Sequence, residues 1–359
     1  MNKSKSSYYL WGKCYSRKDL IQFCSERLAD PNVREFEKEI YLFINEWFSP
    51  SEYIIAKTSG STGKPKKIQL FKKYMRASAQ ATLSFFDLKE KDKILLCLPL
   101  SFIAGKMMVV RALVGGLDLY STDPSSLPEI PMDQIEFSAM VPMQVSNLLN
   151  ENRMALDNMK KLIIGGSFIP DSILDPLQNI DTEVWQTYGM TETMTHIDAR
   201  RLNGTEKSDF YTTLPGSEVS INDGRIVIRA PHLGLKNLET NDLGELNENG
   251  EFNILGRADN VIISGGLKSY PEEIERKLSH VLNGNYMIGS INDDNLGEKL
   301  ILFIEKDENA ERSVFYLWKK IEKALQKFEM PKEIIFLPEI HRTSAGKVDR
   351  RRIKAEAGR

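Results

Sequence analysis

A glycine-rich segment at residues 58–66 has the residue types that bind phosphate. Its glycines let the backbone turn and approach a ligand, while backbone N–H groups, hydroxyls and lysines supply hydrogen-bond donors. It is not a Walker-type loop, because Pro65 follows Lys64 where that loop needs the Ser or Thr that holds magnesium. The alternative is an ordinary flexible Ser/Gly hairpin. The segment consists of Thr58, Ser59, Gly60, Ser61, Thr62, Gly63, Lys64, Pro65 and Lys66.

A second motif, at residues 188–193, combines an aromatic ring, hydroxyls and a carboxylate. It follows an apolar run that we expect to be a buried strand, so its side chains would lie at the carboxyl edge of a sheet, where α/β folds bind ligands. There Tyr188 could stack on a base, Thr191 could contact a phosphate, and Glu192 could bind magnesium through a hard oxygen ligand. Taken alone, a glutamate beside a threonine is more often a solvated loop residue.

Two further places carry weaker signals. Gly165, Gly166 and Ser167 follow another apolar run, so they would place bare backbone at the same edge and admit a flat ring. A tight strand-to-helix turn explains them equally well. Asp242 could accept hydrogen bonds from ribose hydroxyls, although alone it is a turn aspartate. The four histidines are too dispersed to indicate a Ser-His-Asp triad or a metal site.

Hydrophobic periodicity predicts the elements that position these residues. Helical spacing over residues 16–48 predicts two amphipathic helices broken at Asp30-Pro31. Strands are expected on both sides of the glycine-rich segment, and a helix over 72–86. Further on, helix-length segments separate apolar runs typical of buried parallel strands, which indicates an open α/β sheet. These runs cover residues 94–98, 137–141, 162–164 and 183–186.

The rhythm changes in the last third of the chain. Between residues 216 and 255, brief alternating strands with turn signals predict a small antiparallel sheet or barrel. From residue 259 we expect a small α+β domain with a basic tail. We therefore predict an α/β fold with a large N-terminal domain at residues 1–258 and a small C-terminal domain at 259–359. The helices of the latter are expected at 271–282 and 314–328, and its strands at 285–291 and 299–304.

Composition excludes several classes of protein. A 359-residue chain with 41% hydrophobic and 27% charged residues is not disordered, collagen-like or a disulfide scaffold. A net charge of −2 does not favour binding to nucleic acid or to anionic membranes. The three separated cysteines indicate a reducing compartment, and no apolar run is long enough for a signal peptide or a membrane span. We expect a cytoplasmic protein with small-molecule partners.

Taken in order, the motifs resemble those of the adenylate-forming superfamily, which includes acyl-CoA synthetases, adenylation domains of peptide synthetases and luciferases. Several degenerate motifs in the right order are far more specific than any one of them. The resemblance covers the chain from Thr58 to its end. It rests on TSGSTGKPK at 58–66, GGS at 165–167, YGMTET at 188–193, Asp242, GRADNVIISGG at 256–266, YPEEIE at 270–275 and RTSAGKVDR at 342–350.

The resemblance implies a role for each motif. The loop at residues 58–66 would close over the β- and γ-phosphates of ATP, and residues 165–167 and Gly189 would also bind the nucleotide. Tyr188 would stack on adenine, Thr191 would contact the α-phosphate, and Glu192 would hold Mg²⁺. Asp242 and Arg257 would bind ribose.

The C-terminal residues receive roles in the same way. Lys347 resembles the lysine that bridges the carboxylate, the ribose and the α-phosphate as charge builds at phosphorus, which is an electrostatic and positioning role. Asp259 resembles a hinge, and the segment Ser264, Gly265 and Gly266 would be presented to a thiol.

The implied reaction is a two-step ligation. A carboxylate attacks the α-phosphate of ATP to give an acyl-adenylate and pyrophosphate, and coenzyme A then displaces AMP. A short segment before the glycine-rich motif and LPLSFIAGKMM at 98–108 resemble o-succinylbenzoate–CoA ligases, although Phe102 stands where many relatives have histidine.

The resemblance implies the acid, and the charges of that acid indicate what its pocket needs. Because o-succinylbenzoate is a dianion, its second carboxylate needs a cation, and Lys106 and Arg111 are candidates by charge and placement. The commoner explanation for such residues is that they snorkel from an amphipathic helix. Another aryl or fatty acid, a carrier-protein acceptor, and a nucleotide-binding module without catalysis remain as alternatives.

Overall fold

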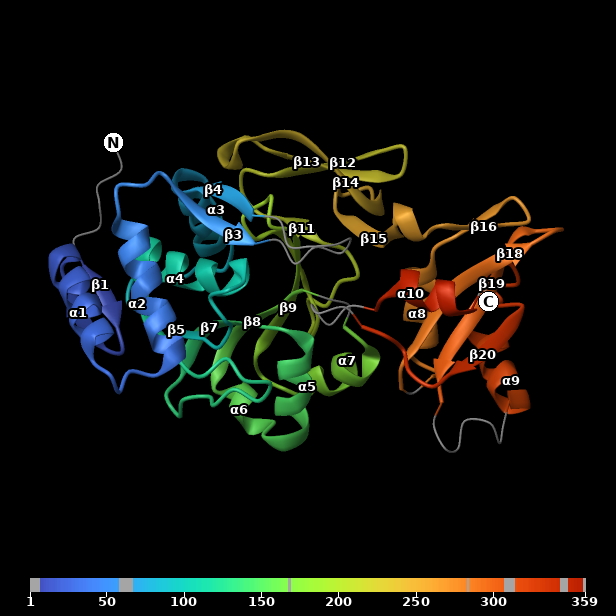
Figure 1. Cartoon of the computed structure of the whole chain (residues 1–359), viewed down its shortest axis with the longest axis horizontal. Helices are drawn as coiled ribbons and strands as arrows, with labels where there is room; N and C mark the ends of the chain where they lie inside the picture. The colour runs from blue at the N-terminus through green and yellow to red at the C-terminus, as the bar shows by residue number, and fades with distance from the viewer. Residues whose placement is uncertain are drawn as a thin grey trace. The chain divides into compact units, whose positions relative to one another are not determined.

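The computed structural model describes residues 7–57, 67–166, 169–282, 284–306, 314–342 and 348–357 (Figure 1). Its contacts divide the chain into two compact units. The first unit contains Met1–Val219 and Ile228–Leu238, and the second contains Ser220–Val227 and Glu239–Arg359.

A nine-stranded sheet forms the centre of the first unit. The strands from β9 through β8, β7, β5 and β6 to β1 pair in parallel, and antiparallel strands close both edges. The predicted open α/β sheet is thereby confirmed. In spatial order the strands are β11 (Thr212–Thr213), β10 (His196–Arg201), β9 (Glu183–Gly189), β8 (Met159–Ile164), β7 (Ile135–Met140), β5 (Lys93–Leu96), β6 (Asp118–Ser121), β1 (Tyr8–Leu10) and β2 (Lys13–Tyr15).

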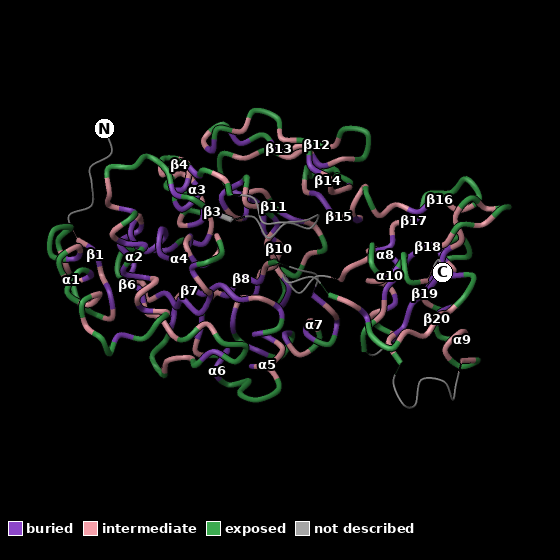
Figure 2. Tube along the Cα trace, in the orientation of Figure 1, coloured by how far each residue is buried: buried purple, intermediate pink, exposed green. Residues whose placement is uncertain are grey.

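Alternation along these strands sends side chains to different helical layers. Val184 packs with Leu148 of α5 (Pro142–Glu151) and Ile173 of α7 (Asp171–Leu177) in one buried cluster. The neighbouring Trp185 instead lies against Phe85 of α3 (Lys72–Phe85), with ring centroids 5.6 Å apart. Figure 2 shows the buried central strands. The sheet is therefore covered on both faces, as buried parallel strands require.

Two other helices complete the first unit's framework. Helix α4 (Ile103–Gly115) packs beside α3 and is buried along most of its length, and α6 (Met154–Asp157) is a single turn before β8. No helix within the described ranges is both long enough and apolar enough to cross a bilayer.

The N-terminal elements follow the predicted pattern. Helices α1 (Arg17–Ala29) and α2 (Glu35–Phe48) are separated by the predicted break at Asp30-Pro31. Strands β3 (Tyr53–Lys57) and β4 (Lys67–Phe71) pair antiparallel on either side of the glycine-rich segment, which lies outside the described residues. The strands predicted on both sides of the segment are thus confirmed.

The antiparallel part predicted after residue 216 is a four-stranded sheet. It consists of β12 (Glu218–Asn222), β13 (Arg225–Ala230), β14 (Leu235–Leu246) and β15 (Phe252–Arg257). The turn between β12 and β13 has positive φ at Asp223 (48°) and Gly224 (79°), the conformation of a two-residue hairpin.

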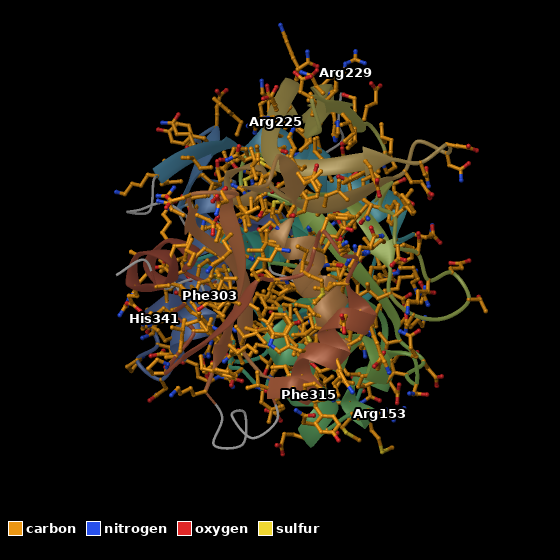
Figure 3. All side chains as sticks on the ribbon, turned by 90° about the vertical axis from the view of Figure 1, so that its right-hand side faces the viewer. Arg153, Arg225, Arg229, Phe303, Phe315 and His341 are labelled. Carbon is orange, nitrogen blue, oxygen red and sulfur yellow. The ribbon has the colours of Figure 1, made fainter. Side chains whose placement is uncertain are left out.

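A five-stranded sheet with helices forms the C-terminal part of the second unit, which confirms the predicted α+β arrangement. Ile274 and Leu302 lie in one of its apolar clusters, and Phe303 lies in the other. Figure 3 shows Phe303, which is buried, and Phe315, which is exposed. The elements are β16 (Ile262–Ser264), β17 (Leu267–Ser269), α8 (Pro271–Leu278), β18 (Tyr286–Asp293), β19 (Gly297–Glu305), α9 (Val314–Ala324), β20 (Glu333–Leu337) and α10 (Arg350–Ala357).

Helices α8 and α9 both end about four residues before their predicted ends. The residues after α8 form a turn in which Leu282 is still buried, so apolar spacing continues beyond the last helical turn. Periodicity marks a buried face, and it does not mark where the helical hydrogen bonds stop.

Candidate nucleotide and acid site

Two adjacent parallel strands end together at the carboxyl edge of the large sheet. Strand β8 ends at Ile164, which pairs with Gln186 of β9, and Gly165 and Gly166 follow. A Cβ atom on Gly165 would stand 2.8 Å from the Thr187 hydroxyl oxygen, and Gly166 has φ of +98°. Bare backbone is therefore required at this edge. Ser167 lies outside the described residues.

The turn after β9 is held by close backbone packing. A Cβ atom on Gly189 would lie 2.2 Å from the carbonyl oxygen of Thr195, so only glycine fits there. The Thr193 hydroxyl accepts the N–H of Met190 at 2.9 Å and donates to the Thr195 carbonyl at 2.6 Å. These contacts fix a compact turn that leaves Glu192 exposed and Thr191 half-buried.

Glu192 is suited to Mg²⁺ by its oxygen ligands and its exposure. No group of three or more His, Cys, Asp or Glu residues within the described ranges could hold a metal ion by itself. A single protein carboxylate is nevertheless a usual ligand for magnesium when substrate phosphates supply the rest. The residues therefore fit a nucleotide-borne Mg²⁺ rather than a metal bound by protein alone.

Tyr188, at the end of β9, is 9% exposed, with its ring edge-on to Tyr211 at 6.3 Å. Its cross-strand neighbour is Asp198 of β10, which sequence reasoning did not identify. Burial raises the pKa of Asp198 well above its usual range, and neither carboxylate oxygen has a hydrogen-bond partner among the described residues. The Asp198 carboxyl is accordingly neutral over a wider pH range than an exposed one.

The second residue that sequence reasoning missed is His196, which lies beside Arg111 of α4. The Arg111 guanidinium is 3.4 Å from His196 Nδ1 and donates to the Thr195 hydroxyl at 3.3 Å. The Thr82 hydroxyl lies 3.3 Å from His196 Nε2. Burial and the neighbouring Arg111 lower the pKa of His196, so its imidazole is neutral.

Arg111 does not snorkel: it is 1% exposed, in contrast to the surface placement that an amphipathic helix would give. Its hydrogen-bond partners within the described residues include no carboxylate, and its Nε has no partner. Burial lowers the pKa of Arg111 to about 9. A guanidinium in such a place is costly unless an anion joins it.

Lys106, the other predicted cation, lies differently. Its ammonium is 4.8 Å from the centre of the Phe43 ring of α2. Burial lowers the pKa of Lys106, while Glu46 and Glu39 raise it. The lysine thus has a cation–π contact and acidic neighbours, which Arg111 lacks.

In the second unit, the two predicted ribose ligands lie together. Asp242 and Arg257 are opposite each other on β14 and β15, and Arg257 donates to Asp242 at 2.9 Å. The Asn241 amide donates to Asp259, and Arg257 lies 4.0 Å from the same carboxylate. The predicted hinge residue is thus joined to the predicted ribose ligands.

The predicted thiol-facing segment is a hairpin turn. Ser264 pairs with Leu267, and Gly265 and Gly266 between them have φ of +58° and +80°. A Cβ atom on Gly266 would meet nothing within 4 Å. The turn therefore needs glycine for its backbone conformation, and Gly266 leaves open space.

Lys347 lies outside the described residues, but the residues on both sides of it are held firmly. Arg342 pairs with Val348 in an isolated bridge, and the Asp349 N–H donates to the His341 carbonyl at 2.8 Å. Arg350 then forms a 2.5 Å ion pair with Glu275 of α8.

Arg350 also donates to the Ile288 carbonyl at 2.8 Å, and Glu275 accepts the Ile288 N–H at 2.7 Å. Both side chains are largely buried, so the end of the segment that carries Lys347 is anchored to α8 and β18.

We expect Arg350→Met to lower the free energy of unfolding of the second unit by about 3–5 kcal/mol, because it leaves the buried Glu275 carboxylate unpaired. Arg352→Met on the same helix is the matched control, since Arg352 is 58% exposed and its pair with Glu356 contributes less than about 1 kcal/mol. Urea unfolding measures both variants. Equal losses would contradict the anchoring role.

We expect Asp198→Asn to increase stability at pH 7 relative to pH 4. The folded-state pKa of Asp198 is raised above the ordinary 3.8, so the stability that its protonation contributes is complete below that value and is lost as pH rises through the folded pKa. Asparagine removes this dependence. Urea midpoints of both proteins across this pH range test it, and parallel curves would refute the neutral carboxyl.

Comparison with known proteins identifies the family of this chain. Residues 28–233 match the AMP-binding enzyme family. The 2-succinylbenzoate–CoA ligase of Salmonella typhimurium is 30% identical over 313 residues, which covers 83% of this chain and 67% of the relative.

Two solved structures agree in fold. An acyl-CoA synthetase (AMP-forming)/AMP-acid ligase II-like protein from Dyadobacter fermentans has 30% identity and a TM-score of 0.62 over 94% of this chain and 98% of its own. The o-succinylbenzoate coenzyme A synthetase from Bacillus subtilis, in complex with ATP and magnesium ion, has 23% identity and a TM-score of 0.70, with 84% and 69% covered.

The Salmonella ligase is longer than this chain, which covers 67% of it. The resemblance that the ordered motifs carry is confirmed by the family match and by the identity to the relatives. The chain therefore belongs to the AMP-binding enzyme family and is an adenylate-forming acid–CoA ligase.

Proposed function

We propose that this ligase activates 2-succinylbenzoate (o-succinylbenzoate), as in menaquinone biosynthesis. One substrate carboxylate attacks the α-phosphate of ATP, pyrophosphate leaves, and an acyl-adenylate forms. The thiol of coenzyme A then attacks the acyl carbon and displaces AMP. Neither step needs a protein nucleophile, which agrees with the absence of a convincing Ser-His-Asp pattern in the sequence.

The observation that carries the choice of acid is the buried guanidinium of Arg111. A dianion offers one carboxylate for reaction and leaves the other to be neutralised inside the protein. Among the described residues, the Nε–H of Arg111 has no hydrogen-bond acceptor, and its guanidinium has no acidic hydrogen-bond partner. It donates to Thr195, which packs on Gly189 at the end of β9. This places a cation next to the segment to which we assign the α-phosphate.

We assign the nucleotide contacts to the motif residues of both units. Thr58, Ser59, Gly60, Ser61, Thr62, Gly63 and Lys64 bind the β- and γ-phosphates, and Thr191 binds the α-phosphate. Tyr188, Gly189 and the bare backbone at Gly165, Gly166 and Ser167 hold adenine. Asp242 and Arg257 bind ribose, an assignment supported by their cross-strand pairing.

Charge on the phosphates is neutralised from two sides. Magnesium, held by Glu192, supplies positive charge to the phosphate oxygens when it is bound. Lys347 lies close to the α-phosphate during attack and stabilises the charge that develops there. The flanking contacts of Arg350 support this role, because they restrict where the lysine segment can go.

In the second step, Ser264, Gly265 and Gly266 approach the thiol, and Asp259 serves as the hinge between residues 1–258 and 259–359. The open space at Gly266 supports an approach by a long, thin thiol arm. A carrier protein presents the same arm, so acceptor choice is tested directly by comparing free coenzyme A with a carrier protein.

The choice of acid is tested with Arg111→Met and two substrates. We expect kcat/KM for 2-succinylbenzoate in pyrophosphate release to fall about 10- to 100-fold, the equivalent of losing one charged hydrogen bond. The value for 4-oxo-4-phenylbutanoate, which lacks the ring carboxylate, should be low in the parent protein and unchanged in the variant.

Lys106→Met is the matched control on the same helix and should leave the ratio of the two substrates unaltered. If Arg111→Met lowers kcat/KM equally for both substrates, the guanidinium does not bind the second carboxylate. If benzoates or fatty acids turn over while 2-succinylbenzoate does not, the proposed acid is wrong.

We expect Lys347→Ala to reduce acyl-adenylate formation by at least 100-fold without a change in urea stability, because it removes charge stabilisation from the transition state only. Pyrophosphate release with saturating acid and ATP measures this step. Full adenylation by the variant would exclude the electrostatic role of Lys347.

A further inference from the structure

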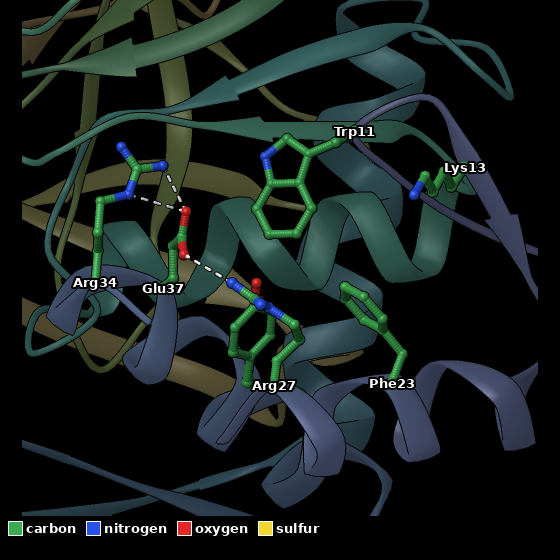
Figure 4. A pocket seen from close by; sticks show the side chains of 7 residues that line it. Trp11, Lys13, Phe23, Arg27, Arg34 and Glu37 are labelled. Carbon is green, nitrogen blue, oxygen red and sulfur yellow. Dashed lines mark hydrogen bonds and ion pairs between the residues drawn. The ribbon is translucent and has the colours of Figure 1, made fainter. Parts of the chain in front are cut away.

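A pocket with a volume of about 430 Å³ lies in the N-terminal part of the first unit, apart from every motif residue discussed above. It is formed by the β1–β2 hairpin together with α1 and α2 (Figure 4). Three aromatic rings and three cations line it, with one carboxylate. The rings belong to Trp11, Phe23 and Tyr41, and the cations to Lys13, Arg27 and Arg34.

The aromatic residues form a connected wall. Trp11 meets Tyr41 with ring centroids 6.1 Å apart and an angle of 76°, and Phe23 meets Tyr41 at 5.8 Å and 90°. Tyr41 is buried and fixes the wall, whereas Trp11 and Phe23 are each partly exposed. Part of their ring surface is therefore open to a flat ligand.

Positively charged side chains outnumber negatively charged ones around this aromatic wall. Glu37 accepts from Arg34 at 2.5 Å and lies 3.9 Å from Arg27, and Arg27 donates to Asp30 at 2.6 Å. Lys13 has no acidic partner among the described residues, and a guanidinium has more donors than these contacts use. The site thus keeps a net positive charge and free N–H donors beside aromatic rings.

Trp11, whose indole lines the pocket, has a strained backbone conformation. Trp11 has φ of +49° and Gly12 has φ of +77°, so both central residues of the hairpin turn are left-handed. Asparagine is the usual residue at the first of these positions, and a bulky side chain is strained there. The turn is pinned to β6, since Trp11 N–H donates to the Leu119 carbonyl at 3.1 Å and Gly12 N–H to Asp118 at 3.0 Å.

We propose that this pocket binds a flat aromatic ring that carries an anionic group. The ring stacks on Trp11 and Phe23, and its anionic group pairs with a cation at one end of the pocket, since Lys13 and Arg34 lie on opposite sides of Trp11 (Figure 4). Two kinds of molecule share this chemistry, a nucleoside monophosphate such as the AMP that the ligase releases, and an aromatic carboxylate. The pocket would then be a second ligand site, separate from the nucleotide and acid site, whichever acid the enzyme activates.

The test uses the full chain labelled with 5-fluorotryptophan, because the protein has only four tryptophans and Trp11 gives a single ¹⁹F resonance. Trp11→Asn assigns that resonance, and asparagine suits the turn, so its urea stability should match or exceed that of the parent. AMP and benzoate are titrated in separate arms. We expect the Trp11 resonance to shift in at least one arm, and the arm that shifts identifies the source of the ligand.

Lys13→Glu combined with Arg34→Glu should weaken the Trp11 response at least tenfold while KM for ATP and kcat in pyrophosphate release stay unchanged. Lys18→Glu on α1, whose side chain is exposed and absent from the pocket lining, is the charge control. The proposal is overturned if neither ligand moves the Trp11 resonance at 5 mM, or if the double variant responds as the parent does. Because activity is assayed on the same samples, failure here is distinguishable from failure of the proposed acid.

Discussion

The approach of backbone to backbone at the carboxyl edge of the large sheet is the constraint on which the site depends. At Gly189 a methyl group would come within 2.2 Å of a carbonyl oxygen, and at Gly165 within 2.8 Å of a hydroxyl. A side chain at Gly189 would require the backbone to move, and one at Gly165 would displace the Thr187 hydroxyl. Parallel pairing of β8 and β9 brings both positions to one edge, so the sheet itself makes a region where a ligand can meet N–H and C=O groups directly.

Below that edge, the first unit buries ionisable side chains, which costs free energy. Arg111 and His196 are buried beside each other, and Asp198 is buried two residues further along β10. A shift in register between His196 and Asp198 changes the alternation of side chains along this strand. Asp198 therefore faces the same side as Tyr188, while His196 lies toward α3 and α4. Ionisable groups that would favour water are thus buried near the turn after β9, and perturbed groups of this kind cluster at functional sites.

The sequence predicted much of the fold because its local signals agree with the tertiary structure. The parallel strands were recognisable as short apolar runs, and the antiparallel hairpins by their turn residues. Short edge strands such as β11 were not, because two residues carry no periodicity. The motifs located the glycines at 165, 166 and 189, whose spacing is tied to backbone geometry.

The burial of Arg111 could not be predicted from the sequence in the same way. An arginine within an apolar helix can extend to the surface or remain inside, and only the packing of α3, α4 and β10 decides between these. His196 and Asp198 likewise have no motif of their own, since their environment depends on a register shift that leaves no mark in composition. One signal was available: charged residues in strands of buried type, directly after a recognised motif, are candidates for a functional environment.

In the second unit, an ion pair and hydrogen bonds hold the described residues that flank the segment containing Lys347. Arg350 is the first residue of α10 and also the partner of Glu275 and Ile288, so the chain is fixed shortly after Lys347. On its other side, the bridge between Arg342 and Val348 brings the two ends of the segment together. A lysine carries its charge on a flexible four-carbon stem. In the role proposed for Lys347, fixed flanking residues reduce the entropy lost when the ammonium is positioned, which is how a contact distant from the chemistry can raise its rate.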